Sequence, residues 1–237
     1  MLDYKINGCN SRVLEPDHNN EIFIDEMIKH GSYADRSTLQ RLENCLDFSY
    51  VDSILDVGCG PGFLCNLLAK KYPDKFVKGI DLSEKAIKYA KKYQNTLPNI
   101  AFEVQDVNLL TEPSNIYDLV ICNSSLHHFI YPYRAVSQML RVTKERKLTI
   151  IYDFCRDVLE DDLKEIRQME LNGSVCTTLS DSLKASLSLN EYSDLADYFF
   201  ENFQARPNFR IFNGNPGSLA SVCIVELVLG KTRNCTY

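Results

Sequence analysis

Apolar, β-branched runs alternate with helical patterns of apolar residues through the first two thirds of this chain. Short apolar runs bounded by turn residues predict strands, at 53–57, 76–81, 100–104, 118–123 and 147–153. Apolar positions at helical spacing predict helices between these strands, near 62–71, 83–95 and 132–143. Strands that alternate with helices in this way predict an α/β fold, with a parallel sheet that has helices on both faces.

Two local signals predict where helices begin. Ser83 is expected to cap the second of these helices, because its hydroxyl can accept a hydrogen bond from an unpaired N–H of the first turn. Ser37 and Gln40 have the spacing of a capping box, which predicts the start of an amphipathic helix that continues through Phe48.

The pattern changes after residue 155. Helices are expected near 156–171 and 191–202, and strands at 208–213 and 221–229. We find no linker, repeat or low-complexity tract, so the sequence predicts a single domain in four parts. These are an N-terminal cap segment (1–34), a core (35–155), a helical lid inserted over the ligand edge of the sheet (156–205) and C-terminal strands (206–237).

Composition narrows the class of protein. A chain of 237 residues with 45% hydrophobic residues can bury the core of one α/β domain. The net charge of −6 argues against a nucleic-acid partner, because phosphate binding requires a basic surface. No apolar stretch approaches the roughly 18 residues that span a bilayer, and the N-terminus lacks a signal-peptide pattern, so we expect a cytoplasmic protein without a membrane partner.

The cysteines and histidines do not have the spacing of metal ligands. The nine cysteines are scattered and form no C-x-x-C pair, and the four histidines do not cluster with them. We therefore expect reduced thiols and no metal site.

The most specific segment is a strand that enters a glycine-rich turn, Asp56-Val-Gly58-Cys59-Gly60-Pro-Gly62. Such a turn lets backbone approach a ligand where a Cβ atom would collide. A dinucleotide site would need its third glycine at position 63, where this chain has Phe63.

The D-x-G-x-G-x-G form resembles instead the first motif of class I S-adenosylmethionine-dependent methyltransferases, and the resemblance covers about residues 35–155. It implies a Rossmann-like, doubly wound sheet of seven mostly parallel strands, with an antiparallel last strand and a helical lid. It also implies that the turn, including Cys59, lies against the methionine end of S-adenosylmethionine, and that Asp56 helps to hold the cofactor's amino group directly or through water.

Two further acids match this family's pattern. Asp81 ends the second strand, where the family's carboxylate accepts hydrogen bonds from both ribose hydroxyls; an acid that only favours the helix start is the alternative. Asp106 follows the third strand and matches the acid that accepts from the adenine amino group. The residues after these acids, Leu82 and Val107, are expected to border the cofactor as well.

The segment after the fourth strand resembles the family's L-H-H form, found in small-molecule methyltransferases. Asn123 and Ser124 would then lie beside the methionine portion of the cofactor. In some O-methyltransferases with this motif, the first histidine is a general base that is oriented by the acid ending the next strand. By alignment these residues are His127 and Asp153, although both histidines could instead only cap the following helix.

The turn into the fifth strand departs from the family. Glu145, Arg146 and Lys147 stand where the family has Pro-Gly-Gly, which predicts an unusual surface turn away from the cofactor motifs. Several aromatic residues could line an apolar pocket, but each could equally belong to the core: Tyr33, Phe129, Tyr131, Tyr133, Tyr198, Phe199, Phe200 and Phe203.

The resemblance therefore favours S-adenosylmethionine-dependent methyl transfer to a small molecule. Two alternatives stay open: a protein of the same fold that uses the cofactor for a non-methylating or regulatory role, and a nicotinamide-dependent oxidoreductase. The sequence does not distinguish a monomer from a homodimer, nor does it identify the acceptor or its reacting atom.

Overall fold

The computed structural model describes residues 21–93, 97–173, 178–212 and 223–231. Seven strands of this described chain form one sheet: β1 (Ser53–Val57), β2 (Phe76–Asp81), β3 (Ile100–Val104), β4 (Tyr117–Asn123), β5 (Thr143–Phe154), β6 (Arg206–Phe212) and β7 (Ile224–Gly230). The α-helices are α1 (Glu21–Cys45), α2 (Phe63–Lys71), α3 (Glu84–Tyr93), α4 (Pro132–Val142), α5 (Glu160–Leu171), α6 (Leu179–Ala185) and α7 (Leu189–Phe203). Three short 3-10 helices are η1 (Phe48–Tyr50), η2 (Val107–Leu109) and η3 (Leu126–His128).

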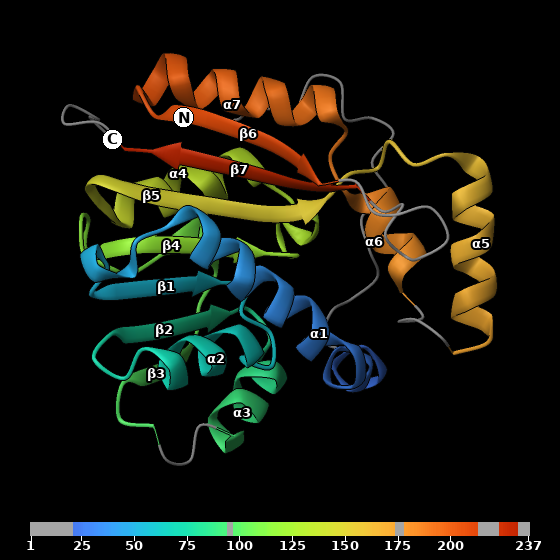
Figure 1. Ribbon diagram of the computed structural model, residues 1–237, viewed down its shortest axis with the longest axis horizontal. Helices are drawn as coiled ribbons and strands as arrows, with labels where there is room; N and C mark the ends of the chain where they lie inside the picture. Colours follow the sequence, from blue (N-terminus) through green and yellow to red (C-terminus); the bar gives the residue numbers. More distant parts are fainter. Residues whose placement is uncertain (1–20, 94–96, 174–177, 213–222, 232–237) are drawn as a thin grey trace.

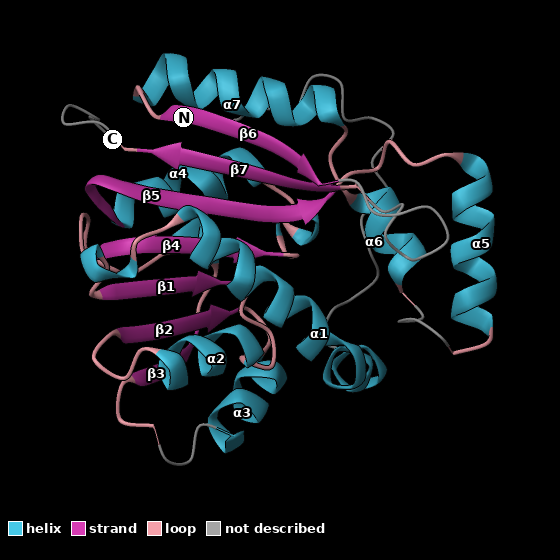
Figure 2. Cartoon of the chain, viewed as in Figure 1, coloured by secondary structure: helices cyan, strands magenta, loops and turns pink. Residues whose placement is uncertain are grey.

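The strand order is β3-β2-β1-β4-β5-β7-β6 (Figures 1 and 2). Strands β1 to β5 pair in parallel, β7 is antiparallel to β5, and β6 is antiparallel to β7. Six of the seven described strands therefore run in the same direction, and β7 runs in the opposite direction. This confirms the predicted doubly wound, mostly parallel sheet with an antiparallel last strand.

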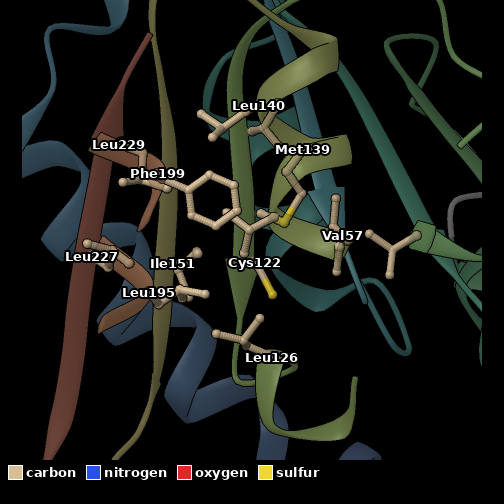
Figure 3. Packing of buried hydrophobic residues seen from close by; sticks show 14 of the residues in the cluster. Val57, Cys122, Leu126, Met139, Leu140, Ile151, Leu195, Phe199, Leu227 and Leu229 are labelled. Carbon is tan, nitrogen blue, oxygen red and sulfur yellow. The ribbon is translucent and has the colours of Figure 1, made fainter. Parts of the chain in front are cut away.

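Each face of the sheet has its own apolar core, because successive strand residues point to opposite faces. On one face Met139 of α4 and Phe199 of α7 pack with Val57, Cys122 and other strand residues (Figure 3). On the other face, residues of α1, α2 and α3 pack with strand residues such as Ile54. In Figure 1, α5 and α6 lie apart from both faces, beyond the ends of the parallel strands.

Strand positions follow the sequence pattern closely from β1 to β4. The first three strands have their predicted bounds, and β4 begins one residue early. Strand β5 begins at Thr143, four residues before the predicted start, because Thr143 pairs with Tyr117 and the strand then bulges before Leu148. Arg146, which has a φ of 61°, lies in this bulge, so the residues that replace Pro-Gly-Gly form an irregular strand.

The predicted start of the first helix was wrong. Ser37 does not cap a helix, because α1 is continuous from Glu21 to Cys45 and also crosses the expected segment boundary at residue 34. A capping-box pattern is a local preference, and here the chain before Ser37 continues the helix. Phe48 belongs to the separate helix η1. The Ser83 cap is confirmed, since its hydroxyl accepts from the backbone N–H of Ala86 at 3.2 Å.

The range 156–205 divides into two differently placed parts. Helices α5 and α6 lie beyond the ends of the strands, whereas α7 packs on the sheet through Tyr192, Leu195 and Phe199. The sequence pattern did not predict the seven-residue helix α6, which is too short for a clear periodic signal. No helix of the described residues is long and apolar enough to cross a membrane.

A buried carboxylate joins three strands at the opposite end of the sheet, where the parallel strands begin. The side chain of Asp118 accepts from the backbone N–H of Ser53 at 3.1 Å, and it contacts the amines of Lys144 at 2.8 Å and Lys147 at 3.2 Å. Burial alone would raise the pKa of Asp118, but these ammonium groups and hydrogen bonds hold it well below its usual range. The irregular start of β5 thus supplies counter-charges to a buried acid.

Candidate active site

A cavity of about 640 Å³ lies at the carboxyl ends of the parallel strands, where ligands bind in this class of sheet. The glycine turn, the loops after β2, β3 and β4, and parts of α1 and α6 all contribute to its wall. The lining residues include Ile24, Met27, Asp35, Gly58, Cys59, Gly60, Asp81, Leu82, Asp106, Val107, Asn123, Ser124, His127, His128, Phe129, Phe154, Leu179 and Ser182.

The glycine turn is a tight backbone wall of this cavity. Gly58, Gly60 and Gly62 have φ values of 71°, 50° and 79°, a region that other residues rarely adopt. A Cβ atom at Gly58 would lie 2.6 Å from the side chain of Ser125, so the turn and the loop after β4 approach too closely for any larger residue. Gly62 lies behind the cavity and begins α2, where a Cβ atom would meet Phe102 at 2.6 Å.

Two of the predicted acids lie on the cavity wall and also hold its loops. Asp81 accepts hydrogen bonds from the backbone N–H groups of Gly60 and Ser83, each at 2.8 Å. Asp106 accepts from the backbone N–H of Asn108 at 2.8 Å. A carboxylate that accepts from backbone in this way is held in a fixed position, which suits the recognition of ligand hydroxyl or amino groups.

The predicted residues that follow these acids differ in exposure. Leu82 is 68% exposed although it borders the cavity, whereas Val107 is buried at the start of η2. An exposed leucine at the edge of a cavity provides apolar surface that a flat ligand could cover.

Asp56 lies beneath the glycine turn and is only 2% exposed. Its carboxylate accepts from the thiol of Cys65 at 3.1 Å. Burial raises the pKa of Asp56 to about 7; the Cys65 thiol opposes this, and the nearby charge of Asp81 adds to it. The Asp56 carboxylate therefore lies beneath the glycine turn, and Asp56 is not among the described residues of the cavity wall.

A chain of hydrogen bonds joins α1 to the end of β4. The hydroxyl of Thr38 donates to the side-chain oxygen of Asn123 at 2.9 Å, and the Asn123 amide donates to the carboxylate of Asp35 at 3.1 Å. Asn123 and Ser124, which were expected to lie beside the cofactor, both line the cavity, and Ser124 has a φ of 51°. Sequence reasoning missed Asp35, since one acid on an amphipathic helix carries no signal of its own.

His127 and Asp153 form a buried pair, and each is 1% exposed. The imidazole Nδ1 lies 2.6 Å from Oδ1 of Asp153, while the backbone N–H of His127 donates to Oδ2 at 2.8 Å. The backbone N–H of Phe154 also donates to Asp153, at 2.8 Å. An ionised carboxylate only accepts, so in this arrangement a neutral His127 carries its proton on Nδ1, beside Oδ1 of Asp153.

The neighbouring histidine lies against this pair. The ring centroids of His127 and His128 are 3.9 Å apart, and both residues line the cavity. The described contact with Asp153 belongs to His127.

The aromatic residues named from the sequence fall into two groups. Phe129 and Tyr131 line the cavity. Tyr133, Tyr198, Phe199 and Phe203 contact one another in the core beneath α7, and Phe200 is exposed. The side chain of Tyr33 lies outside the described part of the chain. The cavity also has Met27, Leu179 and Ser182 on its wall, none of which had a recognisable motif.

Comparison with known proteins gives a consistent result. Residues 51–203 match the model of a family described as methyltransferase domain. Over 92 residues the chain is 35% identical to a ubiquinone biosynthesis O-methyltransferase of Coxiella burnetii, an alignment that covers 38% of each protein. It is 27% identical over 135 residues to a malonyl-[acyl-carrier protein] O-methyltransferase of Halalkalibacterium halodurans, covering 53% of this chain and 50% of that protein. The chain thus spans half or less of the length of these relatives.

A solved structure extends the likeness in fold to nearly the whole chain. The plantazolicin methyltransferase BpumL, in complex with a triazolic desmethylPZN analog and SAH, superimposes with a TM-score of 0.68 and 20% identity, covering 90% of both chains. At this identity the likeness concerns the arrangement of the helices and strands.

Proposed function

Because this chain belongs to the methyltransferase domain family, whose cofactor is S-adenosylmethionine, we propose that it transfers the cofactor's methyl group to an O, N or C atom of a small-molecule acceptor. One observation carries the proposal. The glycine turn, Asp81 and Asp106, which lie in three separate stretches of sequence, all line one cavity at the carboxyl edge of the sheet.

The residues of this cavity fit the cofactor. Gly58 and Gly60 present backbone to the cavity at positions where a Cβ atom would collide with Ser125 or Met27, and two carboxylates are held on the wall by backbone N–H groups. Asn123 and the glycine turn would border the methionine portion, Asp81 the ribose and Asp106 the adenine. When bound, the cofactor supplies an electrophilic methyl group on a sulfonium centre.

The chain's own contribution is to orient the acceptor and, for an O–H or N–H acceptor, to remove a proton. His127 is the proposed general base, acting through Nε2. Asp153 would hold the imidazole in the required tautomer and stabilise its protonated form, as the 2.6 Å contact with Nδ1 supports.

The proposed acceptor is a small molecule with an apolar or aromatic part. The wall outside the glycine turn and the acids is largely apolar, with side chains from α1, the residue after η3, β5 and α6: Ile24, Met27, Phe129, Phe154 and Leu179. By their names, the relatives above are an O-methyltransferase of ubiquinone biosynthesis, a malonyl-[acyl-carrier protein] O-methyltransferase and a plantazolicin methyltransferase. Burial of apolar surface in such a pocket would provide most of the affinity.

Calorimetric titration tests the proposal first. S-adenosylhomocysteine and S-adenosylmethionine should bind with dissociation constants of about 1 to 100 µM, in the usual range for enzyme ligands. NAD, as the matched control, should not bind, because Phe63 replaces the third glycine of a dinucleotide turn.

Mass spectrometry of reactions with a panel of phenols, amines and carboxylic acids then tests transfer itself. A product heavier by one methyl group supports the proposal. Cofactor binding without transfer to any member of a broad panel would favour the non-methylating role, and the absence of cofactor binding would contradict the proposal outright.

A further inference from the structure

Asp35 is a carboxylate on the cavity wall that no motif accounts for. It belongs to α1, yet its Oδ1 accepts from the side-chain amide of Asn123 at the end of β4. Thr38, one turn further along α1, donates to the other end of the same amide. Asn123 is thus held by two residues of α1, and it directs its N–H toward the carboxylate.

A second contact fixes α1 over the glycine turn. The terminal methyl carbon of Met27 is 2.4 Å from the point where a Cβ atom of Gly60 would lie, so α1 packs directly on the turn. Asp35 is eight residues beyond Met27 on the same helix. Two anchors therefore place this carboxylate at the end of the cavity bounded by the glycine turn and Asn123.

Two acids lie near this end of the cavity, Asp35 on its wall and Asp56 beneath the glycine turn. Burial raises the pKa of Asp35 to about 7, the charge of Asp56 raises it further, and the hydrogen bond from Asn123 opposes the rise. Among the described lining residues, Arg134 is the one arginine or lysine, and its Nε donates at 3.0 Å to the backbone carbonyl of Asn108, near Asp106. The described cavity wall has no lysine or arginine beside Asp35. A cationic group placed there would therefore be stabilised by the carboxylates of Asp35 and Asp56.

We propose that Asp35 binds the α-ammonium group of the cofactor's methionine portion, together with the charge of Asp56 beneath the turn. This inference rests on the proposed function, because it takes the cavity as a cofactor site. The methionine portion would lie against the glycine turn and Asn123, the two features that border Asp35. Helix α1 would then contribute directly to cofactor binding, which the cofactor motifs of the sequence do not predict.

The test compares two ligands by calorimetry. S-adenosylhomocysteine carries the amino-acid portion, whereas 5′-methylthioadenosine keeps the adenosine and the thioether but lacks that portion. Asp35→Asn should weaken S-adenosylhomocysteine binding about tenfold or more, as expected for loss of a charge-assisted hydrogen bond, and should change 5′-methylthioadenosine binding less than about twofold.

Asp25→Asn is the matched control, because it removes the same charge from an exposed position on the same helix. It should leave both affinities unchanged. Binding of 5′-methylthioadenosine also reports that the Asp35→Asn protein is folded.

The outcomes separate the inference from the proposed function. If Asp35→Asn weakened the binding of both ligands equally, the proposed role of Asp35 would be wrong. The role would also be wrong if the binding of S-adenosylhomocysteine were not weakened, and Asp35 could then only contact a cationic acceptor. If the unmodified protein bound neither ligand, the proposed function itself would fail.

Discussion

His127 and Asp153 are two buried polar residues whose side chains are in contact. Asp153 is buried, and three hydrogen-bond contacts from two adjacent residues, His127 and Phe154, satisfy its carboxylate. Two of these contacts involve backbone N–H groups, which would be satisfied equally well without an imidazole. The contact with Nδ1 is therefore the part of the arrangement that the proposed chemistry requires.

Replacing these residues tests the proposed base. His127→Ala should lower turnover of an O–H or N–H acceptor by about 10²- to 10⁴-fold, the usual contribution of a general base. Asp153→Asn should also lower turnover, because an amide can donate to Nδ1 and so reverse the tautomer. Steady-state kinetics measures both effects, and calorimetry with S-adenosylhomocysteine checks that cofactor affinity is kept.

His128→Ala is the comparison variant, because it removes a similar ring from the same wall but does not contact Asp153 in the described hydrogen bonds. We expect a smaller loss than for His127→Ala. If His127→Ala kept wild-type turnover across the pH range, the enzyme would act by positioning alone.

Asp81 combines a binding role with a structural one. Asp81→Ala should weaken S-adenosylhomocysteine binding by about 1 to 3 kcal/mol, as partners of the ribose hydroxyls are lost. It should also lower the melting temperature, because the N–H groups of Gly60 and Ser83 lose their acceptor. Asp106→Ala is the control for the melting temperature, because Asp106 lies on the same wall but accepts from Asn108 and not from the glycine turn. Unchanged affinity in Asp81→Ala would remove Asp81 from the ligand site.

At the scale of elements, the sequence pattern was most informative for the strands of the first half of the chain. Their short apolar runs end at turn residues, so β1, β2 and β3 could be bounded from the sequence, although β3 is an edge strand. The start of β5 could not, because Thr143 to Lys147 pair through an irregular bulge that depends on Asp118 of another strand.

The same distinction holds for the site. The glycine turn, Asp81 and Asp106 could be predicted, since each follows directly from a strand end and a known motif. Asp35 and Met27 could not, because their roles depend on how α1 packs across the sheet edge. Side chains that reach a site through tertiary packing leave no local pattern in the sequence.

Helix α6 should respond to ligands, whereas α7 should not. Thr178, Leu179 and Ser182 line the cavity, while α7 packs in the core of the sheet. We therefore propose that residues 178–185, with α1, form the lid that selects the substrate. Hydrogen exchange with cofactor and acceptor should show increased protection at 178–185 and along α1, and no change at 189–203.

Hydrogen exchange in α7 is the internal control, because ligand binding that stabilised the whole molecule would also increase protection there. Protection confined to residues 54–130 would contradict a lid built from α1 and α6.

For the whole molecule, buried acids of opposite behaviour set how stability depends on pH. The folded protein holds the proton of Asp56 more tightly than the unfolded chain, since burial raises this pKa from 3.8 to about 7. The contribution of Asp56 to the free energy of unfolding is fully present below pH 3.8 and is lost as the pH rises through about 7. The lowered pKa of Asp118 has the opposite sign, so its contribution is lost as the solution becomes strongly acidic.

The ligand-free protein should therefore be most stable at mildly acidic pH and lose stability toward pH 8. The loss from Asp56 is on the order of 4 kcal/mol, since one pKa unit corresponds to about 1.4 kcal/mol. Urea unfolding at pH 4, 5, 6, 7 and 8 measures it. Asp56→Asn should reduce this dependence, as should Asp35→Asn, because burial raises the pKa of Asp35 to about 7 as well, whereas Asp118→Asn should not reduce it. A wild-type stability that increases from pH 5 to pH 8 would contradict the expectation.

The position of β7 sets the order in which the molecule can be completed during synthesis. This last described strand lies between β5 and β6, and it pairs Phe154 with Ile224 and Leu148 with Gly230. Until it is made, the outer edge of β5 is open and β6 has no described neighbour in the sheet. The strands that carry the cavity emerge from the ribosome before β7 and can pair early, whereas closure of the sheet waits for β7. The nascent chain thus has an open sheet edge, which favours aggregation, until β7 has been made.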